Sequence, residues 1–181
     1  MLGFFSENRQ EYVLTELACI SDSITVVPIP IRAASAESLS TILNQTELET
    51  LCVTKNTLQV LLDIILSDKH MLLPHLKYLV NFDGYSEADL ARLQRLPFQH
   101  FTLAEIIDRG WKQLGTPLQR NIPTEDSVHL IIYSSGTTGG PPKAAMLTHL
   151  NLISGLSGGK AIGYTFNESD VYLSYVPASH I

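Results

Sequence analysis

The fold class can be read from one stretch of the chain, Ile131-Ile132-Tyr133-Ser134-Ser135-Gly136-Thr137-Thr138-Gly139-Gly140-Pro141-Pro142-Lys143. An apolar, strand-like run passes directly into glycines and small hydroxyl residues, and prolines and a lysine end the loop. Glycines let successive backbone N–H groups turn toward one centre, because no Cβ blocks close approach or forbids positive φ. Hydroxyls and one lysine add donors and positive charge, from Ser134, Ser135, Thr137, Thr138 and Lys143. We therefore interpret the stretch as a phosphate-binding loop. A flexible linker would have polar flanks instead.

Two common phosphate loops do not fit these residues. The Walker loop needs glycine before its lysine and Ser or Thr after it, whereas Lys143 lies between Pro142 and Ala144. The spacing G-x-G-x-x-G of dinucleotide-binding folds does not occur in the chain. A P-loop kinase or GTPase is therefore disfavoured.

The loop resembles the signature of the adenylate-forming (AMP-binding) superfamily, which includes acyl-CoA synthetases, adenylation domains of peptide synthetases and luciferases. That pattern reads Tyr-Thr/Ser-Ser-Gly-Thr-Thr-Gly-x-Pro-Lys-Gly, with Thr/Ser-His a few residues later. The matching residues are Tyr133, Ser135, Gly136, Thr137, Thr138, Gly139, Pro142, Lys143, Thr148 and His149. This chain departs from the pattern in two ways, since the loop has one extra residue before Lys143 and Ala144 replaces the last glycine.

Other segments are similar to the long-chain acyl-CoA synthetase branch of that superfamily. Residues 2–12 resemble its segment "IFSENRPEW", residues 44–48 resemble "NQTE", and residues 173–181 resemble "SYLPLAHI". The resemblance implies an α/β fold, with a largely parallel sheet flanked by helices. It further implies that residues 1–181 are a partial AMP-binding N-terminal domain, incomplete at both ends and without the family's C-terminal domain.

The resemblance also implies a chemistry, that of a long-chain fatty acid–CoA ligase. In this family ATP and a carboxylic acid form acyl-AMP and pyrophosphate, and the thiol of CoA then displaces AMP. The implied phosphate-binding residues are Ser134, Ser135, Gly136, Thr137, Thr138, Gly139 and Lys143. Thr137 and Thr138 are candidate Mg²⁺ ligands, with hydroxyls bonded to their own turn as the alternative. His180 matches the family histidine at the acyl and α-phosphate pocket, and it is the candidate catalytic residue of the whole enzyme; in this chain alone, an exposed terminal histidine is the alternative.

Composition limits the partners. The 181 residues are 45% hydrophobic and 17% charged, with a net charge of −6 and no basic cluster, so nucleic-acid binding is not expected. Cys19 and Cys52 lie far apart in apolar runs, so we expect buried free thiols rather than a disulfide or a metal site. No apolar run approaches the ~18 residues needed to span a bilayer. The resemblance implies a cytoplasmic enzyme, with membrane association of the full-length protein at the cytosolic face of the endoplasmic reticulum or other internal membranes.

The hydrophobic pattern alternates strands with helices. It predicts strands at residues 2–6, 25–29, 50–54, 76–82, 128–134 and 171–175. It predicts helices at residues 9–21, 36–46, 57–66, 87–96, 103–114 and 148–157, the first opened by a capping box of Asn8 with Glu11. Trp111 is expected in the core, Tyr133 packed in its strand with its hydroxyl bonded, and His149 in a capping or packing role.

Two other functions remain open at this stage. One is another acid-adenylating enzyme, acting on aryl or amino acids, which the long-chain segments disfavour. The other is a non-catalytic nucleotide-binding domain, which the longer loop and Ala144 favour mildly. If the ligase interpretation holds, we expect that this chain alone does not complete the reaction.

Overall fold

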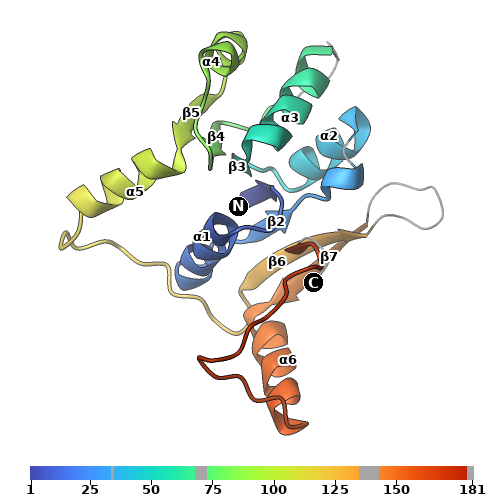
Figure 1. Cartoon of the computed structure of the whole chain (residues 1–181), viewed down its shortest axis with the longest axis vertical. Helices are drawn as coiled ribbons and strands as arrows, with labels where there is room; N and C mark the ends of the chain where they lie inside the picture. Colours follow the sequence, from blue (N-terminus) through green and yellow to red (C-terminus); the bar gives the residue numbers. More distant parts are fainter. Residues whose placement is uncertain (34, 68–72, 135–142, 179–181) are drawn as a thin grey trace.

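The computed structural model of the chain describes residues 1–33, 35–67, 73–134 and 143–178, and it contains one seven-stranded sheet (Figure 1). The strand order is β5-β4-β3-β1-β2-β6-β7. All neighbouring pairs are parallel except β6 and β7, which are antiparallel. The strands are β1 (Leu2–Phe5), β2 (Val26–Pro28), β3 (Thr50–Val53), β4 (Tyr78–Asn81), β5 (Gln99–Thr102), β6 (Val128–Ser134) and β7 (Lys143–Thr148). The predicted α/β fold with a largely parallel sheet is confirmed.

A helix connects each parallel strand to the next one in the chain, and a last helix follows the antiparallel strand. Helices pack on both faces of the sheet. They are α1 (Gln10–Ser21), α2 (Ala36–Gln45), α3 (Lys55–Ser67), α4 (Glu87–Leu93), α5 (Leu103–Lys112) and α6 (His149–Ala161), with a short 3₁₀ turn at Ile31–Ala33. The chain passes from β1 to β2 on one side and then crosses back over β1 to β3. Because such crossovers are right-handed, α1 and α2 cover opposite faces. The connections after β1 and β3 leave in opposite directions, so the sheet has a topological switch point between β1 and β3.

Adjacent residues on the strands point to opposite faces and form two cores. Phe5 and Val27 join α2, α3 and α4 in the larger core, whereas Phe4 and Val26 join α1 in the smaller one. The smaller core also contains Cys19 and Cys52. Both cysteines are buried free thiols, as the sequence predicts.

Gly3, in the middle of β1, faces the larger core. A Cβ at this position would lie 2.5 Å from Leu48 Cδ2 and 2.9 Å from Leu51 Cδ1. Both leucines are fully buried and have little room to move. Glycine is therefore required here for close packing.

The structure contradicts three predictions and adds two strands that the sequence pattern does not predict. β5 and β7 were not expected, because their sequences QHFT and KAAMLT lack the apolar alternation of the other strands. Residues 171–175 are not a strand. Asn8 does not cap α1, whose N-cap is Arg9 without a side-chain cap. Trp111 is 69% exposed rather than buried, and no residue of α5 is buried.

Candidate functional site

The predicted phosphate loop connects β6 to β7 at the carboxyl edge of the sheet. β6 runs parallel to β2, so its carboxyl end lies at the same edge as the carboxyl ends of β1 to β4. Ser134 is the last residue of β6, and it pairs with Lys143, the first residue of β7. The two strands therefore fix both ends of the loop opposite each other, and Lys143 begins the second arm of a hairpin.

The predicted site residues divide into two groups. The structure describes the backbone of Ser134 and places Lys143 with an exposed side chain. The others lie outside the described residues, namely Ser135, Gly136, Thr137, Thr138, Gly139 and His180. Their roles remain predictions.

Tyr133 anchors β6 beside the loop. Its side chain is buried in the larger core, and its hydroxyl donates a hydrogen bond to Gln45 Oε1 of α2 at 3.2 Å. Burial raises the pKa of the Tyr133 hydroxyl, so this group stays a neutral donor. The predicted packing of Tyr133 is confirmed.

His149 packs under the same hairpin. Its ring lies 5.3 Å from the ring of the buried His129 on β6, between ring centroids. The N-cap of α6 is Thr148, whose side chain accepts a hydrogen bond from the backbone N–H of Asn151. His149 therefore has the packing role that the sequence predicts, and Thr148 does the capping.

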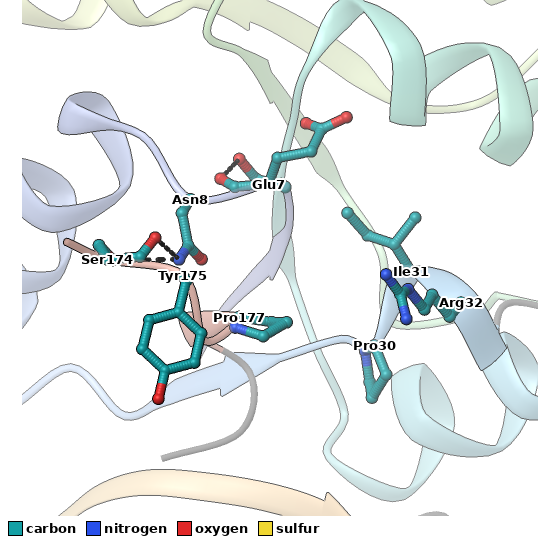
Figure 2. A pocket seen from close by; sticks show the side chains of 9 residues that line it. Glu7, Asn8, Pro30, Ile31, Arg32, Ser174, Tyr175 and Pro177 are labelled. Atoms are coloured by element: carbon teal, nitrogen blue, oxygen red, sulfur yellow. Dashed lines mark hydrogen bonds between the residues drawn. The ribbon is translucent and has the colours of Figure 1, made fainter.

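A cleft of about 450 Å³ lies at the carboxyl edge of the sheet, between the loops that follow β1 and β2 (Figure 2). Open parallel sheets bind ligands at such a position. The loop after β1 forms one wall, residues 30–32 form another, and residues 174–177 form a third. Figure 2 shows Asn8 pointing toward residues 174–177, with Arg32 on the opposite side.

Ion pairs hold the loops next to this cleft. Arg9 bonds Glu11 at 2.7 Å and Asp83 at 2.8 Å, and Asp83 also accepts a hydrogen bond from the backbone N–H of Lys55. The bond to Glu11, with a smaller contribution from Asp83, raises the pKa of Arg9, while Arg9 lowers the pKa of Glu11 to about 2. The guanidinium of Arg9 is thus already paired with the carboxylates of Glu11 and Asp83.

Glu7, which lines the cleft, is held from the neighbouring strand. Thr54, directly after β3, donates its hydroxyl to Glu7 Oε2 at 2.8 Å. Arg32 lines another wall of the same cleft. The cleft therefore offers one fixed carboxylate and one arginine on different walls.

Sequence reasoning missed Glu7, Asn8 and Arg32 as cleft residues. The available signal was their place, because polar residues that directly follow two adjacent parallel strands meet at one edge of the sheet. The strand order was needed to use this signal, since only that order makes β1 and β2 neighbours in the sheet.

The described residues were also searched for other kinds of site. Residues 1–33, 35–67, 73–134 and 143–178 hold no group of three or more His, Cys, Asp or Glu side chains that could bind a metal ion. In the same part of the chain, no helix is long and apolar enough to cross a membrane.

Comparison with known proteins identifies the family. The sequence model of the AMP-binding enzyme family, described as "AMP-binding enzyme", matches residues 1–181, so the chain belongs to this family. Long-chain-fatty-acid–CoA ligase 1 of Homo sapiens is 31% identical over 184 residues, which cover 99% of this chain and 25% of that protein. The chain is thus similar to fatty acid–CoA ligases along almost its whole length.

Two solved structures are also similar to this chain. A long-chain-fatty-acid–CoA ligase from Archaeoglobus fulgidus is 26% identical with a TM-score of 0.61, over 91% of this chain and 28% of that one. The A domain of a carboxylic acid reductase from Segniliparus rugosus, solved with AMP and a carboxylic acid, is similar in fold, with 24% identity and a TM-score of 0.68 over 84% of this chain and 24% of that one. This chain spans about a quarter of the length of the curated relatives it matches.

Proposed function

We propose that this chain forms the triphosphate-binding part of a long-chain fatty acid–CoA ligase. The observation that carries the proposal is the β6–β7 hairpin, which holds Ser134 opposite Lys143 at the carboxyl edge of the sheet. The match to the AMP-binding family and the similarity to fatty acid–CoA ligases support the reaction class. Because the chain covers about a quarter of those ligases, we propose that residues 1–181 are a partial N-terminal domain and do not turn over alone.

The proposed reaction has two steps. A carboxylate oxygen of the fatty acid attacks the α-phosphorus of ATP, and the bond to pyrophosphate breaks. The sulfur of CoA then attacks the acyl carbon, and AMP leaves with the electron pair of the broken bond. Negative charge develops on pyrophosphate in the first step, and convergent backbone N–H groups and a lysine stabilise such charge.

In this proposal the loop residues bind the β- and γ-phosphates. Backbone amides and hydroxyls would come from Ser134, Ser135, Gly136, Thr137, Thr138 and Gly139, and the positive charge from Lys143. His180 would lie at the acyl and α-phosphate pocket. Mg²⁺ would be held by Thr137 or Thr138, whose hydroxyl oxygens suit this cation. We propose ATP, a long-chain fatty acid and CoA as the substrates, and a cytoplasmic location at internal membranes.

Titration calorimetry of the 181-residue chain tests the triphosphate-binding role. We expect ATP to bind, and Lys143→Ala to weaken it roughly 10- to 100-fold, since hydrogen bonds to charged groups contribute about 1.5–3 kcal/mol. Lys160→Ala, which makes the same charge change on α6, is the control and should leave the affinity for ATP near that of the parent. Equal affinities for ATP and AMP would contradict recognition of the triphosphate.

A second assay tests turnover and the acid. We expect no ATP–pyrophosphate exchange by this chain with long-chain, aryl or amino acids. Exchange with any of these acids would show that the chain is competent alone, and the acid that supports it would identify the substrate class.

A further inference from the structure

Residues 173–178 form a wall segment, which closes one side of the cleft without being a strand. Residues 173–177 are exposed, and Ala178 is the residue of this segment that packs against the smaller core. A second cleft, of about 320 Å³, lies between the wall segment and the start of α1. Because the wall segment borders two clefts, burial of apolar area contributes little to holding it in place.

One side chain holds the wall segment from the opposite side, that of Asn8 after β1 (Figure 2). Its Nδ2 donates to the carbonyl oxygen of Val176 at 2.7 Å and to Ser174 Oγ at 3.1 Å. Its Oδ1 accepts from the backbone N–H of Ala178 at 2.7 Å. Within the described ranges, every hydrogen bond between the wall segment and another part of the chain has Asn8 as its partner. The position of the wall segment therefore depends on this one amide.

The two shortest bonds of Asn8 imitate a parallel strand. In a parallel ladder, one residue uses its N–H and C=O to bond two residues that are two positions apart on the neighbour. The Asn8 amide does the same toward Val176 and Ala178. A ladder would have to be broken at several residues to free the wall segment, whereas a change of the Asn8 rotamer removes all of these bonds together.

The ordinary structural role of Asn8 is not used. Asparagine is among the best N-cap residues, and Asn8 lies next to the start of α1. The N-cap position is nevertheless Arg9, and α1 has no side-chain cap. The amide of Asn8 bonds the distant wall segment instead.

We propose that the wall segment is a movable gate of the cleft and that Asn8 is the positioning residue that holds the gate closed. Segments with few buried contacts open locally at a small cost in free energy, while the core stays folded. The wall segment meets this condition, because it has one half-buried residue and one hydrogen-bonding partner outside itself. Its release would open the cleft toward α1. Such a gate acts on any ligand of the cleft, so it does not depend on the proposed ligase reaction.

Hydrogen exchange of the chain tests the contact. We expect Asn8→Ala to speed exchange of the Ala178 amide about tenfold, because it removes a hydrogen bond that protects this N–H. Asn8→Asp keeps the acceptor for Ala178 but loses the donor to Val176, so its exchange should be intermediate. Ser174→Ala removes only the longer bond and should have the smallest effect.

Paramagnetic relaxation across the cleft tests the gate itself. A nitroxide on Arg32→Cys would lie on the opposite wall, and the native thiols of Cys19 and Cys52 are buried. In the otherwise unchanged chain, we expect the label to broaden the amide signals of Ser174 and Tyr175. Asn8→Ala should lower this relaxation by about half or more, because loss of the hydrogen bonds shifts the gate toward its open state.

Asn121→Ala is the matched control, since it makes the same substitution at an exposed position in the loop before β6. It should leave the relaxation of Ser174 and Tyr175 near that of the parent. The urea midpoint of Asn8→Ala should also stay near that of Asn121→Ala, because the Asn8 side chain bonds only the wall segment.

Three outcomes would overturn the proposal. Unchanged exchange of Ala178 in Asn8→Ala would mean that the contact does not form in solution. Faster exchange with unchanged relaxation of Ser174 and Tyr175 would mean that Asn8 does not hold the gate. A urea midpoint of Asn8→Ala well below that of Asn121→Ala would mean that the wall segment unfolds together with the core and is no gate.

Discussion

The first and last parts of the chain form similar elements but bury them differently. In α1 to α4, each helix has buried residues that face one of the two cores. In α5 and α6 no residue is buried. Large apolar side chains of the later part are exposed, including Phe166 at 81% and Val171 at 97%.

Local signals for helix formation are nevertheless equal in the two parts. Ser35 and Ser86 form capping boxes in the first part, and Thr102 and Thr148 form them in the second. Capping satisfies the free N–H groups at a helix start wherever the helix lies. Capping boxes therefore mark the start of helices in both parts, and they do not determine whether a helix is buried.

The largest expected difference is between two leucines on helices. Leu61 of α3 is fully buried, and Leu156 of α6 is 65% exposed. We expect Leu61→Ala to lower the free energy of unfolding by about 2–5 kcal/mol, since it leaves a cavity, and Leu156→Ala by less than about 0.5 kcal/mol. Urea midpoints of both variants measure this. Similar losses would mean that α6 is packed in solution, and the contrast would not hold.

This contrast also explains which features could be predicted from the sequence. The strand at residues 128–134 and the helix starts after Ser35, Ser86 and Thr102 depend on local chemistry, and the structure confirms them. Trp111 was placed in the core because Ile107 and Leu114 share its face at helical spacing. Periodicity shows that such a face exists, but it does not show what covers it.

Asn8 shows the same limit at the candidate site. Its spacing to Glu11 fits a capping box, yet its partners lie at residues 174–178. Residues 171–175 have strand-like composition, but no neighbouring strand pairs with them among the described residues. Both errors concern contacts between distant segments, which the local pattern does not contain. The phosphate-binding role of residues 135–142 could be predicted because its chemistry lies in consecutive residues, and that role stays a prediction.

Two glycines extend the comparison between buried and exposed elements to the backbone. A Cβ on Gly3 would meet Leu48 and Leu51, whereas a Cβ on Gly155 in α6 would meet no atom within 4 Å. We expect Gly3→Ala to destabilise the chain by about 1–3 kcal/mol through overpacking. We expect Gly155→Ala to stabilise it by about 0.5–1 kcal/mol, because alanine favours the helix.

Thermal unfolding of both glycine variants measures these opposite signs. Stabilisation by Gly3→Ala would show that the larger core has room beside β1. Destabilisation by Gly155→Ala would show that α6 has a close neighbour at this position.

The smallest expected effect concerns the buried pair of His129 on β6 and Glu16 on α1. His129 Nε2 lies 3.7 Å from Glu16 Oε1 of α1, and both side chains are largely buried. Desolvation raises the pKa of Glu16. Desolvation lowers the pKa of His129, and the nearby His149 lowers it further. Each group therefore favours its neutral form in the folded chain.

These two shifts act in opposite directions on stability. As the pH falls below about 6.5, His129 becomes protonated in the unfolded chain before it does in the folded chain. His129 therefore lowers the free energy of unfolding toward acid. As the pH falls toward about 4.5, folded Glu16 takes up a proton before the unfolded form does, so Glu16 raises stability toward acid. The two contributions partly cancel in the parent chain.

Single substitutions should separate the contributions of His129 and Glu16 to the pH dependence of stability. Between pH 6.5 and 4.5, we expect the free energy of unfolding of Glu16→Gln to fall more steeply than that of the parent, by up to about 1.4 kcal/mol per pH unit. His129→Gln should change the slope in the opposite direction. The control is Glu168→Gln, which makes the same charge change at an exposed side chain. It should leave the slope near that of the parent. Urea unfolding at several pH values measures the slopes. If both Glu16→Gln and His129→Gln changed the slope in the same direction relative to the parent, a buried pair that stays neutral would be ruled out.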